Sequence, residues 1–158
     1  MNRLQQIIAF LCSEYPMKQE LSKARLTKMV YLADWFSSLV NDVQLTNIEW
    51  VFNHYGPYVD DVISDISFSP NFKVEQEKNI YGSPKYIVFY IGNKSDINLD
   101  SQTKDILHLV IDKTRSMYFN EFIDYVYSTY PIKQKTRYSK LDLPYLAKEY
   151  KNNIQRKQ

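Results

Sequence analysis

The stretch of residues 23–40 constrains the fold of this chain most. Its sequence, KARLTKMVYLADWFSSLV, contains no Gly or Pro, and its apolar residues recur at helical spacing, so we predict one unbroken helix that Ser22 caps at its N-terminus. One arc of this helix carries Leu26, Met29, Val30, Ala33, Phe36 and Val40, and the opposite arc carries Lys28, Tyr31, Leu32 and Trp35. A surface helix normally shows a polar back. We therefore expect this helix either to lie at the centre of the fold or to present its second face to a partner.

The remaining pattern predicts a mainly helical α+β fold. Around the central helix (about 23–40) we expect a compact bundle of about five to six helices in all. Alternating residues flank the Gly82-Ser83-Pro84 turn and predict a β-hairpin, which a third segment could extend to a three-stranded sheet (about 48–53, 72–77 and 85–91). Pro57 suits the first turn of a further helix, over residues 58–67.

Length and composition predict a single domain. The 158 residues are 44% hydrophobic and 24% charged, which is enough to bury a core. We expect a domain over residues 1–150 and a frayed basic tail over residues 151–158. The sequence contains no run of about 18 apolar residues, so we predict no membrane span. The single Cys12 cannot form an internal disulfide, so we expect a cytoplasmic protein.

Charge is unevenly distributed along the chain. Residues 1–130 hold 12 Lys and Arg against 16 Asp and Glu, a balance of −4, whereas residues 131–158 hold 8 against 2, a balance of +6. A basic end suggests contact with an acidic partner surface or with nucleic acid. Four tyrosines interleave with these basic residues: Tyr130, Tyr138, Tyr145 and Tyr150. They fit either a single-stranded nucleic-acid binder or a terminal helix that tyrosines anchor while lysines face water.

The sequence shows no motif for catalysis. It has two histidines, one cysteine and three glycines, without the spacing of a zinc site, a phosphate-binding loop or a nucleophile elbow. We therefore expect no enzyme, no catalytic residue, no cofactor and no metal. One alternative stays open, a small hydrolase in which His54 pairs with Asp60 or Asp61 as acid and base.

Two segments carry a resemblance to a known family. They are LSKARLTKMVYLADW, at residues 21–35, and EWVFNHYGPYVDDV, at residues 49–62. The matching positions are Leu26, Lys28, Met29, Val30, Tyr31, Ala33, Asp34, Trp50, His54, Tyr55, Gly56, Pro57 and Val59. With the later FIDYVYSTYPI and LDLPYLAKEY, the chain resembles the Panacea domain, also called the SocA-like antitoxin domain.

The resemblance implies an antitoxin-like binding protein of a bacterium, a phage or another mobile element. In that family the domain is thought to neutralise a cognate protein toxin by direct, stoichiometric binding. An adaptor that delivers a client to a protease is the alternative within the binding class. A homodimer through tyrosine-rich surfaces also stays open.

Within the shared motif we expect two kinds of role. Structural positions are Leu26, Met29, Val30, Ala33, Gly56 and Pro57. Large amphipathic side chains are favoured as interface anchors, so we predict a partner groove formed by Lys28, Tyr31, Trp35, Trp50, His54 and Tyr55.

Overall fold

A computed structural model describes residues 1–78 and 80–156 of the chain. This described part contains seven α-helices: α1 Arg3–Glu14, α2 Lys23–Asn41, α3 Asp61–Ser67, α4 Ser101–Thr114, α5 Phe119–Tyr127, α6 Tyr130–Gln134 and α7 Leu143–Arg156. It also contains two short 3-10 turns, η1 Lys18–Glu20 and η2 Lys94–Asp96, and five strands: β1 Trp50–Asn53, β2 Gly56–Tyr58, β3 Phe72–Lys78, β4 Pro84–Tyr90 and β5 Lys140–Leu141. The mainly helical α+β class that the sequence predicts is therefore confirmed.

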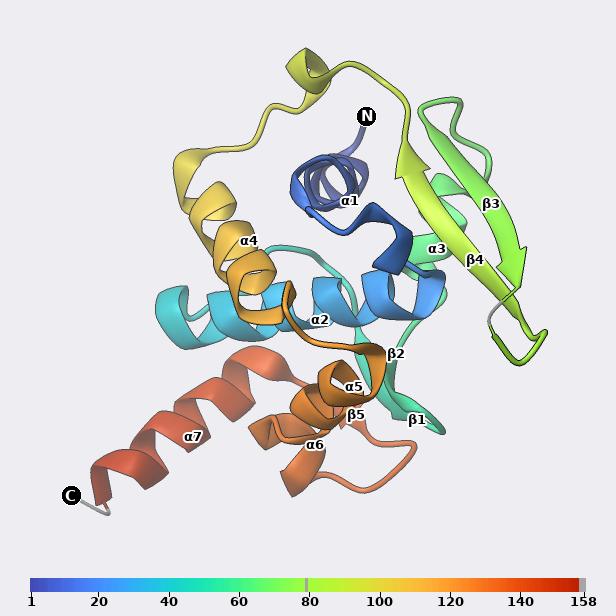
Figure 1. Ribbon diagram of the computed structural model, residues 1–158. Coiled ribbons are helices and arrows are strands. Elements are labelled where there is room, and N and C mark those ends of the chain that lie inside the picture. The colour runs from blue at the N-terminus through green and yellow to red at the C-terminus, as the bar shows by residue number, and fades with distance from the viewer. Residues whose placement is uncertain (79, 157–158) are drawn as a thin grey trace.

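Helix α2 lies in the middle of the molecule. In Figure 1 it crosses the view horizontally, with α1 and α4 on one side and α5 and α7 on the other. Ser22 is its N-cap and accepts a hydrogen bond of 3.1 Å from the backbone N–H of Arg25. Both predicted arcs are buried over most of the helix, which is the central placement of the two that the pattern allowed. Val40, in the last turn, is 63% exposed, so the buried arc ends before it.

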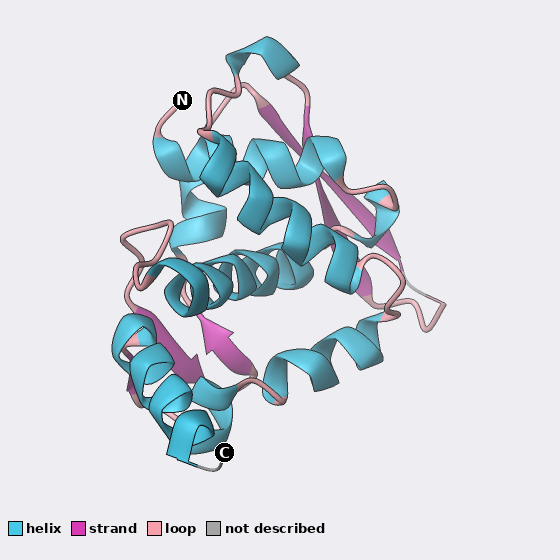
Figure 2. Ribbon diagram, turned by 90° about the vertical axis from the view of Figure 1, so that its left-hand side faces the viewer, coloured by secondary structure: helices cyan, strands magenta, loops and turns pink. Residues whose placement is uncertain are grey.

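The strands form two separate antiparallel sheets (Figure 2). Strands β3 and β4 make the predicted hairpin, in which Val74 lies opposite Val88. The alternative of a three-stranded sheet that includes residues 48–53 is wrong. Strand β1 pairs instead with β2 and β5, in the order β2-β1-β5, because the chain reverses directly after Asn53 and brings residues 56–58 alongside it.

Pro57 lies in a strand rather than at the start of a helix. It sits opposite Phe52 in β2, and α3 begins only at Asp61. Strand β2 is at the edge of its sheet, where the missing N–H of a proline need not remove a ladder hydrogen bond. The sequence-based prediction of a helix over residues 58–67 therefore began too early.

The C-terminal helix α7 packs against α2. The Trp35 and Tyr150 rings meet at 6.2 Å between centroids, and Tyr130 lies 5.1 Å from Tyr150. Residues 151–156, which the sequence placed in a frayed tail, continue this helix as far as Arg156, and residues 157–158 lie outside the described part. Lys151 fixes the helix to the end of α2 through a 2.7 Å ion pair with Asp42. In the described ranges 1–78 and 80–156, no helix is long and apolar enough to cross a bilayer.

Candidate functional site

A buried carboxylate organises the loop that follows α2. Asp34 accepts backbone N–H hydrogen bonds from Leu45 at 2.9 Å and Thr46 at 3.0 Å, and the indole N–H of Trp50 donates to it at 2.8 Å. The Thr46 hydroxyl donates to the same carboxylate. Burial raises the pKa of Asp34 to about 6, although these donors pull the pKa down. Asp34 thus ties α2 to residues 44–48 and to β1.

A buried guanidinium joins α2 to the segment between α4 and α5. Nη2 of Arg25 donates to the Tyr15 hydroxyl at 2.6 Å and to the carbonyls of Thr114 and Met117 at 2.8 and 2.9 Å. Its guanidinium lies 4.5 Å from the centre of the Phe122 ring. Over residues 1–78 and 80–156, its Nε and Nη1 have no hydrogen-bond partner and no carboxylate forms an ion pair with it. Three hydrogen bonds and an aromatic ring therefore stabilise the Arg25 guanidinium, where a carboxylate would be the usual partner of a buried cation.

The structure closes most of the predicted partner groove. Lys28, Tyr31, Trp35 and Trp50 are all buried. The Tyr31 hydroxyl lies 2.9 Å from Oγ1 of Thr129, and its ring meets Trp50 at 5.6 Å. An open groove over these side chains is therefore a wrong expectation, because the central position of α2 covers both of its faces.

Lys28 is unusual among these buried residues. Its amino group makes no hydrogen bond or ion pair within the part of the chain that the structure describes. Burial lowers the pKa of Lys28 because the charged ammonium loses hydration there. Burial of Lys28 in the fold therefore costs hydration free energy of its ammonium group.

The exposed members of the predicted groove lie at one end of the three-stranded sheet. His54 and Tyr55 form the turn between β1 and β2, and Tyr55 is 76% exposed. The loop before β5 reaches the same place, where Nε of Arg137 donates to the carbonyl of His54 at 3.3 Å. The two turns lie together at the lower right of Figure 1. We call the surface formed by His54, Tyr55, Lys135, Arg137 and Tyr138 the turn surface.

Gly56 sets the position of one half of the turn surface. Its φ of 101° is a conformation that side chains disfavour. A Cβ at this position would also lie 3.4 Å from the Tyr127 ring, and that ring meets Phe52 at 6.3 Å. A glycine therefore lets the β1–β2 hairpin turn sharply and rest against the C-terminal end of α5.

The sequence-based site included His54 and Tyr55 but not Arg137 and Tyr138. Lys135, Arg137 and Tyr138 belong to the basic, tyrosine-containing end of the chain, which was the sequence feature that could have pointed to them. Their position beside His54 depends on the pairing of β5 with β1, in which Trp50 lies opposite Leu141. Partner contact by His54 and Tyr55 stays a prediction.

The structure does not assemble the acid–base pair of the hydrolase alternative. The Tyr58 hydroxyl donates to Asp60 at 3.0 Å, and Asp61 lies in the first turn of α3. Neither carboxylate forms an ion pair with His54 in the described residues. Those residues also contain no group of three or more His, Cys, Asp or Glu side chains that could hold a metal ion.

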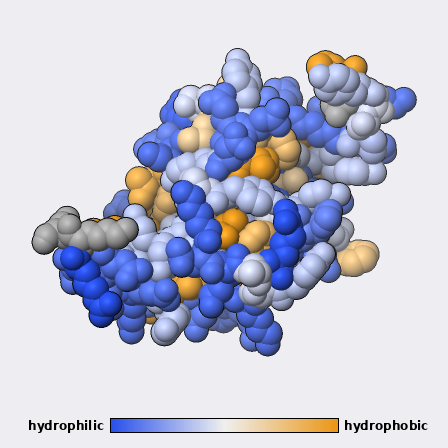
Figure 3. Space-filling view, turned by 90° about the horizontal axis from the view of Figure 1, so that it is seen from below, coloured by the Kyte–Doolittle hydropathy of each residue, from blue (hydrophilic) through white to orange (hydrophobic). Residues whose placement is uncertain are grey.

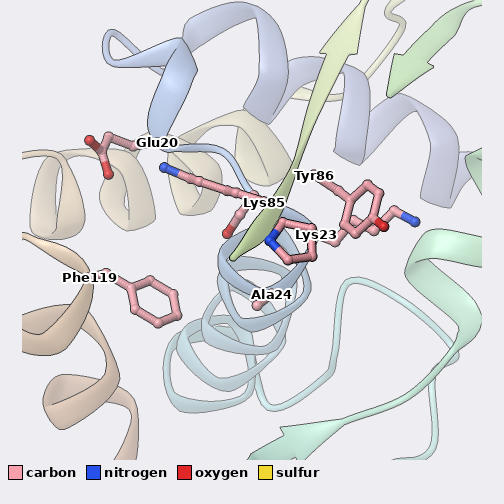
Figure 4. A pocket seen from close by; sticks show the side chains of 8 residues that line it. Glu20, Lys23, Ala24, Lys85, Tyr86 and Phe119 are labelled. Carbon is pink, nitrogen blue, oxygen red and sulfur yellow. The ribbon is translucent and has the colours of Figure 1, made fainter. Parts of the chain in front are cut away.

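A groove of about 430 Å³ opens between the start of α2, β4 and α5 (Figure 4). The ammonium of Lys23 lies 4.8 Å from the centre of the Tyr86 ring, and Phe119 faces the groove from α5. Ser22 also lines it, but its hydroxyl is engaged as the N-cap of α2. The lining thus combines aromatic rings with scattered charges and shows no hydrogen-bonded nucleophile and base.

Comparison with protein-family models gives a match to a known family. The model of the family described as "Antitoxin SocA-like, Panacea domain" matches residues 26–131, which is more than half of the chain and includes α2 from Leu26 onward and the β1–β2 hairpin. No curated protein and no solved structure matches the chain. The matched range ends before Lys135, so one half of the turn surface lies outside it. From the extent of the family match, we conclude that this chain belongs to the SocA-like antitoxin family of Panacea domains.

Proposed function

We propose that this protein is an antitoxin that neutralises a cognate protein toxin by direct, stoichiometric binding. The observation that carries the proposal is the family match over residues 26–131. Membership of an antitoxin family supports a protein partner in general terms. The toxin itself, and action in the cytoplasm of a bacterium, are parts of the proposal.

We further propose that the protein acts by binding alone, without a catalytic step, a cofactor or a metal. The polar side chains inside the molecule support this view, because Asp34 and Arg25 form their hydrogen bonds with loops and helix ends of the same chain. At the turn surface, by contrast, the side chains of Lys135 and Tyr138 make no hydrogen bond, ion pair or ring contact with the described residues. A surface of that kind suits recognition of another protein.

Co-expression with the product of the neighbouring reading frame tests the proposal. We expect the neighbour to arrest growth alone, and the pair to restore growth and to co-purify as a complex of fixed stoichiometry. A neighbour without toxicity, or a pair without a complex, contradicts the proposal. The level of the neighbour's product separates two modes: a stable complex keeps that level, whereas an adaptor that delivers it to a protease lowers it.

A further inference from the structure

Tyr138 holds a backbone conformation that normally belongs to glycine. Its φ is 71°, and Tyr138 and Asp42 are the two residues other than glycine with positive φ that the described residues contain. The N–H of Tyr138 donates to the carbonyl of Phe52, and the N–H of Phe52 donates to the carbonyl of Ser139 at 2.9 Å. Two residues thus oppose one residue of β1, which is the pattern of a β-bulge whose first position is usually a glycine.

The bulge directs a large side chain into solvent. Tyr138 is 70% exposed, and its ring makes no hydrogen bond or ring contact with any residue in the ranges 1–78 and 80–156. The left-handed conformation costs a non-glycine residue about 1–2 kcal/mol. A strained residue whose side chain does nothing for the fold is a reason to look for a function.

The charged residues next to Tyr138 in sequence are all basic. Lys133, Lys135, Arg137 and Lys140 are all exposed, and no Asp or Glu occurs between residues 131 and 141. Over the described residues, none of these four cations forms an ion pair. Figure 3 views the molecule from below and shows a face covered mainly by hydrophilic side chains, with hydrophobic residues in small, separate spots. The five residues that define the turn surface are themselves basic or aromatic.

We infer that the turn surface binds an acidic region on the surface of the protein partner. The Tyr55 and Tyr138 rings lie against that region as flat anchors, and Lys135 and Arg137 pair with its carboxylates. Exposed aromatic side chains and arginine are enriched where proteins meet. This inference rests on the proposed function, since it names the surface and the partner chemistry of that binding.

The charge of the rest of the molecule favours an acidic protein over nucleic acid. Outside residues 131–141 the net charge is −2, made up of −4 over residues 1–130 and +2 over residues 142–158. This charge disfavours a long phosphate backbone that extends beyond the turn surface. An acidic patch on a folded protein is compact, so it can meet the basic turns without running along the acidic body. The experiment must therefore distinguish binding of an acidic protein surface from binding of nucleic acid.

Four variants test the inference. Tyr138→Gly and Tyr138→Ala remove the ring, and the pair Lys135→Glu with Arg137→Glu reverses two charges of the turn surface. The matched control reverses two exposed cations on other elements, Lys94 and Arg115, to Glu. Should Arg137→Glu fail to fold, Lys133→Glu with Lys135→Glu makes the same change in charge.

Affinity for the co-purified toxin is the first readout. We expect both Tyr138 variants to weaken binding about tenfold or more, and the Lys135–Arg137 reversal to weaken it about a hundredfold. The Lys94–Arg115 control should stay within about threefold of the parent protein. The melting temperature of Tyr138→Gly should be no lower than that of the parent, so that loss of binding cannot come from loss of fold. Unchanged affinity in the turn-surface variants overturns the inference while leaving the antitoxin proposal intact.

A second readout works without a toxin. A labelled polyglutamate of about 6 residues, short enough to stay within the turn surface, and a labelled oligothymidylate of about 20 nucleotides are titrated onto the same proteins. We expect polyglutamate to bind the parent protein and the Lys94–Arg115 control, and to bind the Lys135–Arg137 reversal about tenfold more weakly. The inference is overturned if the parent protein binds oligothymidylate more tightly than polyglutamate and the Lys135–Arg137 reversal abolishes that binding. The turn surface would then be a nucleic-acid site. If no toxin is found, this readout still decides which chemistry the turn surface binds. Failure of the antitoxin proposal and failure of the turn-surface inference are therefore distinguishable.

Discussion

The interior of α2 and the turn surface use polar residues in opposite ways. Inside, Asp34 and Arg25 are fully buried, and each holds several loops or helix ends through its hydrogen bonds. At the turn surface, Tyr55 and Tyr138 are mostly exposed, and the Tyr138 side chain holds nothing in the described chain. Both regions belong to the same sheet-and-helix unit, because Trp50 in β1 bonds to Asp34 and Phe52 in β1 bonds to Tyr138.

This difference separates residues that make the fold from residues that are available to a partner. A motif shared within a family can contain both kinds, and here the two motif segments together hold Asp34, Trp50 and Tyr55. Substitutions inside should change stability strongly, whereas substitutions at the turn surface should change binding and leave stability nearly unaffected. The predictions below test that division, beginning with the largest expected effect on stability.

Asp34→Ala should be the most destabilising change. It leaves the donors on Leu45, Thr46 and Trp50 without their acceptor, and the loss of a buried charged acceptor costs about 3–5 kcal/mol of unfolding free energy. Urea unfolding followed by tryptophan fluorescence measures this, since Trp50 itself reports on the site. Asp105→Ala, at an exposed position of α4, is the control and should change the free energy by less than about 0.5 kcal/mol. If both variants lost a similar amount of unfolding free energy, the hydrogen bonds to Asp34 would not be important for stability.

The stability that Asp34 contributes should depend on pH. Burial raises the pKa of Asp34 to about 6, from 3.8 for an ordinary Asp side chain. Between these values the folded protein keeps a proton that the unfolded chain releases, so the unfolding free energy falls as pH rises from about 4 to about 6. The shift corresponds to a fall of about 3 kcal/mol.

Asp34→Asn isolates this effect because asparagine does not titrate. The free energy of the parent protein minus that of the variant should be larger at about pH 4 than at about pH 7. Chemical denaturation at both pH values gives the difference, in which the other titrating groups cancel. A difference that grows with pH means that the hydrogen bonds to Asp34 outweigh its burial.

Arg25 should tolerate an apolar replacement of similar length better than truncation. In Arg25→Met the unpaired Nε and Nη1 groups disappear, and the Tyr15 hydroxyl keeps a bond of 3.3 Å to the Thr114 carbonyl. We expect Arg25→Met to cost about 2 kcal/mol, since the Met117 carbonyl loses its donor. Arg25→Ala adds a cavity against Phe122 and should cost at least about 1–2 kcal/mol more. Thermal and urea unfolding compare the two variants, and equal losses would mean that packing against Phe122 is unimportant.

The sequence predicted the fold better than the site, for a physical reason. Helical spacing over residues 23–40 and the capping role of Ser22 are local properties, and they identified the central helix. The same spacing could not tell whether the Tyr31 and Trp35 face would meet a partner or β1, Thr129 and α7 of the chain itself. Burial is decided by segments far away in sequence. Trp35 lies against Tyr150, more than one hundred positions later.

The turn surface was missed because its two halves are joined only in three dimensions. Strand β5 has two residues, Lys140 and Leu141, which is too short a run for an alternating pattern to be recognised. Pairing of β5 with β1 nevertheless places Arg137 beside His54. The positive φ of Tyr138 was equally hidden, since a tyrosine at a position that favours glycine gives no local sign of a bulge.

Tyr138→Gly should have the smallest effect on stability, and with the opposite sign. Glycine adopts the φ of 71° found at this position without the left-handed penalty of about 1–2 kcal/mol, but it adds about 0.5–1 kcal/mol of chain entropy to the unfolded state. The balance is a gain of up to about 1.5 kcal/mol. Tyr138→Ala is the matched control, because it also removes the exposed ring but keeps the left-handed penalty. Urea unfolding should therefore rank Gly above Ala, whereas both should bind the toxin equally poorly. A glycine variant no more stable than the alanine variant would show that Tyr138 is not strained, and the division between a stabilising interior and a turn surface kept for binding would then lose its energetic support.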